Sequence, residues 1–269
     1  MKYFLSFLFS CLLCFPFSLK AQRNINGLVG AEKAFAALSV SKGTRTAFLQ
    51  FLDSTGIVFE KGMPVNGFQT WKSRGNLPGI LNWHPQYAEI SASGDLGYTT
   101  GPWTFQNHDS IAARGQYTTI WHVNENGEWK FLADMGVGGT PVNNSIVVHE
   151  LKGSRQHGTD SLDMLDQENK FISSFSHSPE DAYRKYLSSQ SILNRNGQLP
   201  ATTSSEQHRE ILQTPASIRF TVLGHGFSAA GDLGYVYGSI QLNEISESYL
   251  HIWRRERSGW KLAVEVLRY

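Results

Sequence analysis

The feature that most constrains this chain is an internal repeat. The segment SASGDLGYTTGPW, which begins at Ser91, returns 137 residues later as SAAGDLGYVYGSI, which begins at Ser228. Further matches keep the same order along both halves: Glu32, Phe35, Pro78, Trp83, Tyr117, Ile120, Trp121 and Gly127 recur as Glu168, Phe171, Pro215, Phe220, Tyr249, Ile252, Trp253 and Gly259. Ordered self-similarity of this kind indicates a duplication. We predict two homologous units, residues 24–136 and 160–269, joined by a linker over residues 137–159.

Each unit begins with helical patterns and ends with strand patterns. In the first unit, AEKAFAALSVSK and TRTAFLQFLDSTG space their apolar residues along one helical face, and a short third helix is expected around GFQTWKSR. After Pro78 the pattern alternates with a period of two in YAEISASG, LGYTTGPWTFQ, GQYTTIWHVN and EWKFLADMG. The expected fold class is α+β, with N-terminal helices packed on an antiparallel sheet in each unit.

The repeated segment itself is typical of a turn that enters a strand. Asp95 and Asp232 follow a glycine in the shared S-x-x-G-D-L-G-Y. An aspartate at such a place usually accepts hydrogen bonds from nearby backbone amides. We therefore expect these two aspartates to be structural, and we expect any functional difference between the copies where the two segments diverge.

The first 21 residues are typical of a secretory signal peptide. Lys2 precedes an apolar run of about a dozen residues, and small and polar residues follow up to Ala21. An uncleaved membrane anchor is the alternative, but Pro16 and a run shorter than the ~20 residues of a membrane span favour cleavage after Ala21. We expect a secreted or periplasmic protein that is not stably inserted in a membrane.

Composition excludes several classes of function. Both cysteines, Cys11 and Cys14, lie in the N-terminal segment, so the mature chain would have no disulfide or cysteine-based metal site; an acylated-cysteine lipoprotein is the minor alternative. Without Lys2 and Lys20 the basic count falls from 24 to 22 against 23 acidic residues, a net charge of about −1 that gives no reason to expect nucleic-acid binding. Because H-E-x-x-H, phosphate-loop and dinucleotide signatures are missing, we expect no metal and no cofactor.

The ordered set of patterns resembles a known superfamily. Two N-terminal helices, GIVF after the second, SGDLGYTTGPW, and finally TIWHVNENGEWKFLADMG are similar to the SnoaL-like and ketosteroid-isomerase-like members of the nuclear transport factor 2-like superfamily. The resemblance covers the first unit, and in the second it is close only from Ser228 onward. It implies two cones, each a strongly curved sheet wrapped around helices with a pocket open at one end. Many members are homodimers packed sheet to sheet, so we expect a monomeric pseudo-dimer.

Asp134 is the candidate catalytic residue. A period of two places it on one strand face with Lys130 and Leu132, opposite Phe131 and Ala133. If that face looks into an apolar interior, burial would raise the pKa of Asp134 and make it a candidate general base. The alternative is a solvated carboxylate at a strand end. Glu265 occupies the matching place in the second unit, where nearby arginines could pair with it.

Three further residues are candidates to act with Asp134. Tyr98 or Tyr117 would polarise a substrate oxygen. His122, on the neighbouring strand, is the acid/base partner that a hairpin could bring near Asp134, although an exposed histidine is the alternative.

The candidate ligand-binding residues are aromatic: Trp71, Trp83, Tyr98, Trp103, Tyr117 and Trp121. Trp71 and Trp103 stand out because the second unit has His208 near the first position and Ile240 at the other, whereas the demands of the scaffold should be similar in both copies. Strict alternation puts Tyr98 and Trp103 on opposite strand faces unless a bulge intervenes at Gly101.

These observations leave three hypotheses, because the fold does not fix the function. The first is a secreted protein that binds a small apolar or carbonyl-containing ligand in the first unit, with a mainly structural second unit. The second is a cofactor-free isomerase, dehydratase or hydrolase that uses Asp134 as general base. The third is a structural or protein-interaction pair with filled cones.

Overall fold

The computed structural model describes residues 22–76, 78–139, 145, 147–151 and 162–269. The predicted signal peptide and most of the predicted linker lie outside these residues. None of the helices in the described ranges is long and apolar enough to cross a membrane.

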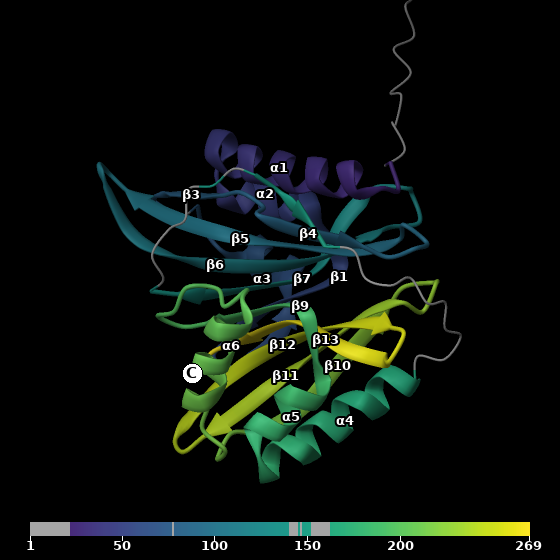
Figure 1. The fold of residues 1–269 in the computed structure, drawn as a ribbon. Coiled ribbons are helices and arrows are strands. Elements are labelled where there is room, and N and C mark those ends of the chain that lie inside the picture. Colours follow the sequence, from purple (N-terminus) through teal and green to yellow (C-terminus); the bar gives the residue numbers. More distant parts are fainter. Residues whose placement is uncertain (1–21, 77, 140–144, 146, 152–161) are drawn as a thin grey trace, which may run out of the picture.

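The first unit, as we call the elements from α1 to β8, begins with two helices (Figure 1). Helix α1 spans Ile25–Lys42 and α2 spans Thr44–Phe51. The side chain of Asn24 accepts from the backbone N–H of Gly27, which satisfies one of the free amides at the start of α1. Between the two helices Gly43 has a φ of 90°, a conformation that favours glycine, so the chain turns there after one residue.

Strands then build the first sheet. Their bounds are β1 Leu52–Glu60, β2 Met63–Asn66, β3 Ile80–Trp83, β4 Tyr87–Ile90, β5 Leu96–Asn107, β6 Ser110–Val123, β7 Trp129–Gly138 and β8 His149–Glu150, with helix α3 at Gly67–Ser73. The sheet order is β2-β1-β7-β6-β5-β4-β8, and β3 also pairs with β5. The predicted short third helix is present as α3. The long hairpin of β5 and β6 is visible at one end of the sheet in Figure 1.

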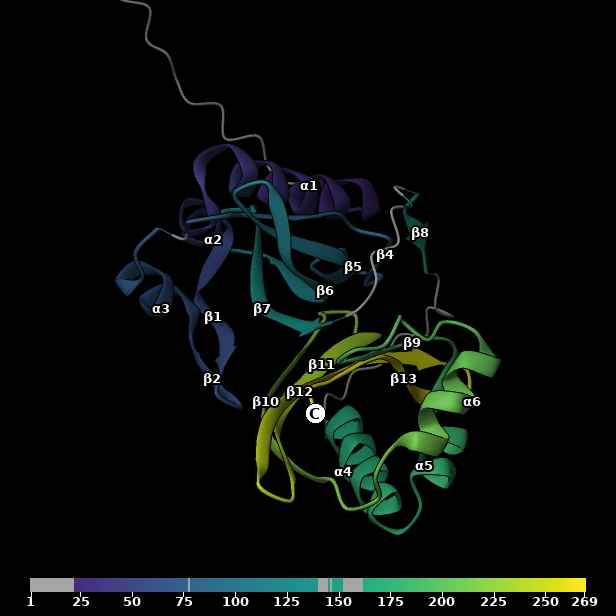
Figure 2. The ribbon, with the colours of Figure 1, turned by 90° about the vertical axis from the view of Figure 1, so that its left-hand side faces the viewer.

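The second unit, from α4 to β13, repeats this plan. Its elements are α4 Leu162–His177, α5 Pro179–Tyr186, β9 Leu187–Arg195, α6 Ser204–Gln213, β10 Arg219–Phe227, β11 Leu233–Leu242, β12 Ile245–Glu256 and β13 Gly259–Leu267. The sheet order is β10-β11-β12-β13-β9. Figure 2 shows this sheet curving around α4 and α5.

The α+β class is confirmed, and the expectation of wholly antiparallel sheets is wrong in one detail. The first strand after the paired helices, β1 or β9, runs parallel to the last strand, β7 or β13. The sequence pattern missed this strand because LDSTG reads as the end of a helix. In the structure α2 ends at Phe51, and Leu52 is already extended.

The two sheets pack back to back, and helices α1, α2, α4 and α5 lie on their outer sides (Figure 1). The layer between the sheets is one buried apolar cluster to which both units contribute: Leu96, Tyr98, Ile120, Ala133, Met135 and Val137 from the first, and Ile192, Leu233, Tyr235, Leu250, Ile252, Val264 and Val266 from the second. This is the sheet-to-sheet arrangement expected of a pseudo-dimer. That the chain is a monomer in solution stays a prediction.

The repeated turns hold each other across this layer. Asp95 accepts a hydrogen bond from the backbone N–H of Ala229 at 2.9 Å, and Asp232 accepts one from that of Ala92 at 2.8 Å. Each aspartate also accepts from the serine that opens its own turn. The aspartates are structural, as predicted, but each accepts hydrogen bonds from the other unit as well as from its own turn.

A buried ion pair lies in the same layer. The guanidinium of Arg254 on β12 donates two hydrogen bonds to the carboxylate of Glu89 on β4, at 2.5 and 2.6 Å. The Tyr98 hydroxyl donates to the same carboxylate at 2.9 Å. The pair joins the two units in a region that excludes water, because both side chains are nearly fully buried.

Candidate functional site

A cavity of about 260 Å³ lies inside the first unit, between its helices and its sheet. It is lined by Phe35 of α1, Phe48 of α2, Leu81 and Trp83 of β3, Trp103 of β5, Tyr117 of β6, and Asp134 and Gly136 of β7. The walls are therefore mainly aromatic, and Asp134 and Tyr117 supply the ionisable groups.

Asp134 faces this cavity because β7 carries a bulge. Ala133 pairs with Ile120 of β6, but Phe131 pairs with the next residue, Trp121, so Leu132 is an extra residue on β7. The strict alternation that we predicted for this strand is therefore wrong. Phe131 and Asp134 both face the interior, while Ala133 faces the other sheet.

The Asp134 carboxylate has little compensation from the protein. Its Oδ1 accepts a hydrogen bond from Thr119 Oγ1 at 2.7 Å, and within the described ranges its Oδ2 has no hydrogen-bonding partner. Burial raises the pKa of Asp134 to about 6, and the Thr119 bond offsets that rise only in part. The surface that Asp134 retains faces the cavity, so a bound ligand could reach the carboxylate.

A second buried carboxyl, Glu32, lies behind the cavity wall. It accepts hydrogen bonds from the indole N–H groups of Trp83 at 2.5 Å and Trp121 at 2.8 Å, and from the Thr99 hydroxyl. Burial, with a smaller contribution from the charge of Asp134, raises the pKa of Glu32 to about 7 against these three hydrogen bonds. We did not predict a role for Glu32, although its match to Glu168 on an otherwise apolar helical face was a usable signal.

Tyr117 is the other ionisable residue that lines the cavity. The hydroxyl oxygen is buried and has no hydrogen-bonding partner at normal geometry in the part of the chain that the structure describes. Burial, followed by the charge of Glu32, raises the pKa of Tyr117 well above its usual value, so the hydroxyl is neutral. A buried hydroxyl without a partner costs about 1–3 kcal/mol, a cost that a ligand could relieve.

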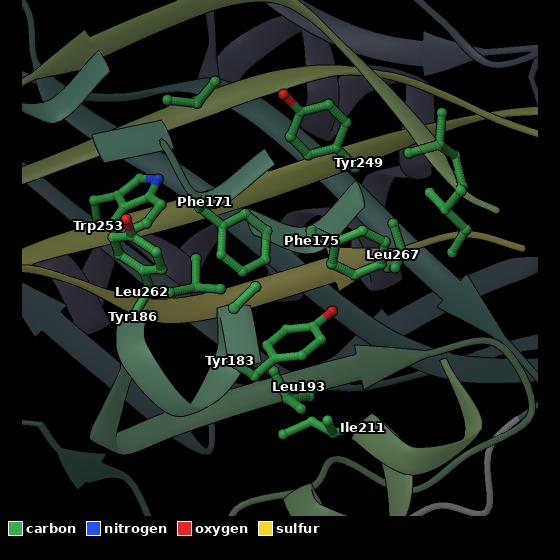
Figure 3. Packing of buried hydrophobic residues seen from close by; sticks show 14 of the residues in the cluster. Phe171, Phe175, Tyr183, Tyr186, Leu193, Ile211, Tyr249, Trp253, Leu262 and Leu267 are labelled. Carbon is green, nitrogen blue, oxygen red and sulfur yellow. The ribbon is translucent and has the colours of Figure 1, made fainter. Parts of the chain in front are cut away.

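In the second unit the matching interior is occupied by side chains. Figure 3 shows Phe171, Phe175, Tyr183, Tyr186, Tyr249 and Trp253 packed together with Leu262 and Leu267. All of them are buried.

The polar groups of that interior are paired with one another. His251 bonds Glu168 through Nδ1 at 3.0 Å and Glu265 through Nε2 at 2.8 Å, and Arg195 forms an ion pair with Glu265. Against the effect of its burial, the two carboxylates raise the pKa of His251 to about 9. Against the effect of burial, Arg195 and His251 lower the pKa of Glu265 to about 2. The buried charges therefore compensate one another.

Strand register identifies which residue of each copy takes the same place. Thr119 pairs with Asp134 where His251 pairs with Glu265, and Gly136 pairs with Tyr117 where Leu267 pairs with Tyr249. His251 and Leu267, which neutralise or fill the second interior, therefore have the smaller counterparts Thr119 and Gly136 in the first. On the second helix of each unit, the sequence repeat matches Tyr183 to the apolar Phe48.

Trp83 accounts for the free hydroxyl of Tyr117. In the second unit the Tyr249 hydroxyl donates to Glu168 at 3.1 Å. In the first unit the corresponding glutamate, Glu32, accepts a hydrogen bond from the Trp83 indole instead. Phe220, which matches Trp83 in the second unit, has no N–H to donate. The sequence difference at this position thus accounts for the Tyr117 hydroxyl lacking the glutamate partner that Tyr249 has.

The predicted site residues fall into two groups. Asp134, Tyr117, Trp83 and Trp103 line the cavity together. Trp71 and Trp121 lie behind its wall. The ring of Trp71 stacks on Phe48 with centroids 4.1 Å apart, and the indole of Trp121 donates to Glu32.

Tyr98 and His122 lie away from the cavity. Tyr98 faces the other sheet, because the pairing of β5 with β6 runs without a bulge from Leu96 to Phe105 and alternation holds there as predicted. His122 pairs in register with Lys130 rather than Asp134, and its ring bonds Asp53 at 2.8 Å. The predicted contact between His122 and Asp134 is therefore not formed.

No group of three or more side chains able to hold a metal ion occurs within the described residues.

Comparisons with known proteins find similarity at the level of structure. No family model matches the chain, and no curated protein matches it. Among solved structures it is similar to an NTF-2 like protein of unknown function from Shewanella oneidensis (15% identity, 40% of this chain and 94% of that chain, TM-score 0.34). It is also similar to a putative ketosteroid isomerase from Parabacteroides distasonis (14% identity, 43% of this chain and 95% of that chain, TM-score 0.33). A third similar structure is a putative polyketide cyclase from Sinorhizobium meliloti (13% identity, 40% of this chain and 98% of that chain, TM-score 0.32). Each match covers the length of about one unit.

Proposed function

We propose that the chain binds a small molecule in the cavity of the first unit and that the second unit is a filled scaffold. One observation carries the proposal. Tyr117 and Asp134 lack in the first unit the protein partners that satisfy Tyr249 and Glu265 in the second. Because buried polar groups are normally paired, groups that stay unpaired or only partly paired on the wall of a cavity are best explained by a ligand that completes them.

The cavity sets the size and character of this ligand. A volume of about 260 Å³ lies just below the range of roughly 300–1,000 Å³ that is usual for drug-sized ligands. The aromatic walls require an apolar body, and Asp134 with Tyr117 requires one polar end. A ligand with one ring and one hydroxyl, carbonyl or amino group has this character.

The experiment is a thermal shift titration with benzyl alcohol, on the wild type and on Gly136→Leu. Leucine at this position reproduces Leu267 of the filled unit, and a Cβ at Gly136 would meet the indole nitrogen of Trp103 at 3.3 Å and the backbone oxygen of Gln116 at 3.5 Å. We expect binding to the wild type and a loss of at least tenfold in affinity in the variant. Equal affinity of both proteins, or no shift in either, would refute the proposal.

Proton transfer is a second candidate function, favoured by the presence of Asp134 and Tyr117 on one cavity. With a pKa of about 6, Asp134 would be mostly deprotonated near neutral pH and could accept a proton from a carbon beside a carbonyl, while Tyr117 donates to the carbonyl oxygen. Deuterium uptake at the α-carbon of cyclohexanone in D₂O, dependent on Asp134, is the measurement. An unchanged exchange rate in the presence of the protein would exclude this reaction for that ketone.

We also propose that the chain is secreted, on the strength of the N-terminal pattern alone. Mass spectrometry of the protein recovered outside the cytoplasm tests this proposal. The molecular mass should be that of a chain that begins at Gln22, because cleavage is expected after Ala21.

A further inference from the structure

The charges around the cavity of the first unit define the kind of polar end that its ligand carries. Asp134 lines the cavity, and Glu32 lies close enough for the charge of Asp134 to raise the pKa of Glu32. Among the described residues, no lysine, arginine or histidine lines this cavity. The second unit, in contrast, sets His251 and Arg195 against its two buried glutamates. Relative to its copy, the first unit therefore lacks positive charge.

Basic residues on the surrounding elements do not supply that charge. On α1, Lys33 and Lys42 are exposed. On α2, Arg45 donates to the carbonyl of Lys72, and on β7 Lys130 donates to the carbonyl of Gln50. The titratable groups that face Asp134 are Glu32 from α1 and Tyr117 from β6.

The basic residues of the strands beside β7 are likewise turned away. Arg114 of β6 is exposed, and His122 on the same strand bonds Asp53. On β1, the residue that pairs with Asp134 is Val58, and Glu60 forms an ion pair with Arg74 at the surface.

The aromatic walls of the cavity are also suited to a positively charged group. Phe35, Phe48, Trp83, Trp103 and Tyr117 surround the cavity, and several pack edge to face, with centroids 4.6 Å apart for Phe35 and Trp83. The faces of aromatic rings attract organic cations, and rings grouped around a small cavity are a known way to bind ammonium groups. A carboxylate beside such rings adds direct charge pairing.

We infer that the first cavity selects a small organic cation, a protonated amine with one apolar ring, over neutral and anionic molecules of the same shape. This rests on the proposed function, because it specifies the polar end of the ligand in the same cavity. The ammonium donates to Asp134 Oδ2, the ring packs against the aromatic walls, and the Tyr117 hydroxyl accepts a second N–H. The cation thus supplies the charge that His251 and Arg195 supply in the second unit.

The test compares two probes of matched shape, benzylamine and benzyl alcohol, by calorimetric titration of the full chain at pH 8 and pH 5. At pH 8 benzylamine is protonated and Asp134 is ionised, and we expect benzylamine to bind at least tenfold more tightly than benzyl alcohol. At pH 5 Asp134 is mostly protonated, so this ratio should fall several-fold. Asp134→Asn should bring the ratio at pH 8 close to one.

Each alternative outcome has a definite meaning. If both probes bind equally at pH 8, or if the preference for benzylamine persists in Asp134→Asn, the inference is wrong and the proposed small-molecule site stands. If neither probe binds the wild type, or if Gly136→Leu binds both as well as the wild type does, the proposed function fails together with the inference. The circular dichroism of each variant, compared with that of the wild type, verifies that the fold is retained.

Discussion

Replacing Arg254 by methionine should lower the free energy of unfolding by about 3–5 kcal/mol, because the change leaves the Glu89 carboxylate buried without its partner. The Arg254 side chain is 3% exposed and that of Glu89 is 6% exposed, and their two hydrogen bonds cross from one unit to the other. Methionine keeps much of the apolar stem of arginine, so the lost free energy of unfolding comes mainly from removal of the positive charge. Urea unfolding followed by circular dichroism and by tryptophan fluorescence measures it.

Two controls separate this effect from a general loss of charge. Arg184 forms an ion pair with Asp181 at the surface, and Arg184→Met should cost less than about 1 kcal/mol. The double variant Arg254→Met with Glu89→Gln should recover part of the loss, since no buried charge is then left unpaired. If Arg254→Met is as harmless as Arg184→Met, the pair does not hold the units together.

Asp134→Asn should have the opposite effect and stabilise the protein by about 2–3 kcal/mol at pH 8. The folded-state pKa of Asp134, about 6, is above its usual value of 3.8, so ionisation of this residue costs stability once the pH exceeds 3.8. The cost grows up to about pH 6 and is complete above it. The gain of the variant should therefore be full at pH 8 and should shrink toward zero below about pH 4.

Glu265→Gln is the matched control, because it makes the same chemical change at the corresponding position of the second unit. The folded-state pKa of Glu265, about 2, is below its usual value of 4.5, so its ionised form contributes stability above pH 4.5 that is lost as the pH falls toward 2. At pH 8 Glu265→Gln should therefore destabilise the protein, by about 3–5 kcal/mol, because it leaves Arg195 and His251 without a carboxylate. Urea unfolding at several pH values measures both variants, and the same sign for both would contradict the assignment.

If Asp134→Asn stabilises the protein and Glu265→Gln destabilises it, the first unit keeps a carboxyl group whose charge is costly, whereas the charge of its counterpart in the second unit is compensated. Natural proteins tolerate such costs mainly where function requires them. The stability of Asp134→Asn and its binding of benzylamine should therefore change in opposite directions.

The repeat was the part of the fold that the sequence predicted best. Matched positions such as Trp121 and Trp253 proved to have the same role in both copies, since each indole donates to the glutamate of the first helix of its unit. The sequence could not indicate that Asp95 and Asp232 bond across the two copies, because that contact depends on how the two sheets pack.

The candidate site was predicted in part, and the failures have physical causes. Comparison of the copies predicted Trp103 for the cavity, and the last strand predicted Asp134. The bulge at Leu132 was not predictable, since a period of two has no signal for one extra residue, and it decides which way Asp134 points. His122 was assigned a partner by proximity of strands alone, whereas the register places Thr119 opposite Asp134 and His122 opposite Lys130.

The first unit has an open cavity, whereas side chains fill the interior of the second. Xenon enters apolar cavities and is visible in diffraction, so a crystal of the protein pressurised with xenon tests the claim without knowledge of the ligand. We predict xenon between Phe48, Trp103 and Gly136, and none among Phe171, Tyr183 and Leu267. Xenon in both interiors, or only in the second, would contradict it.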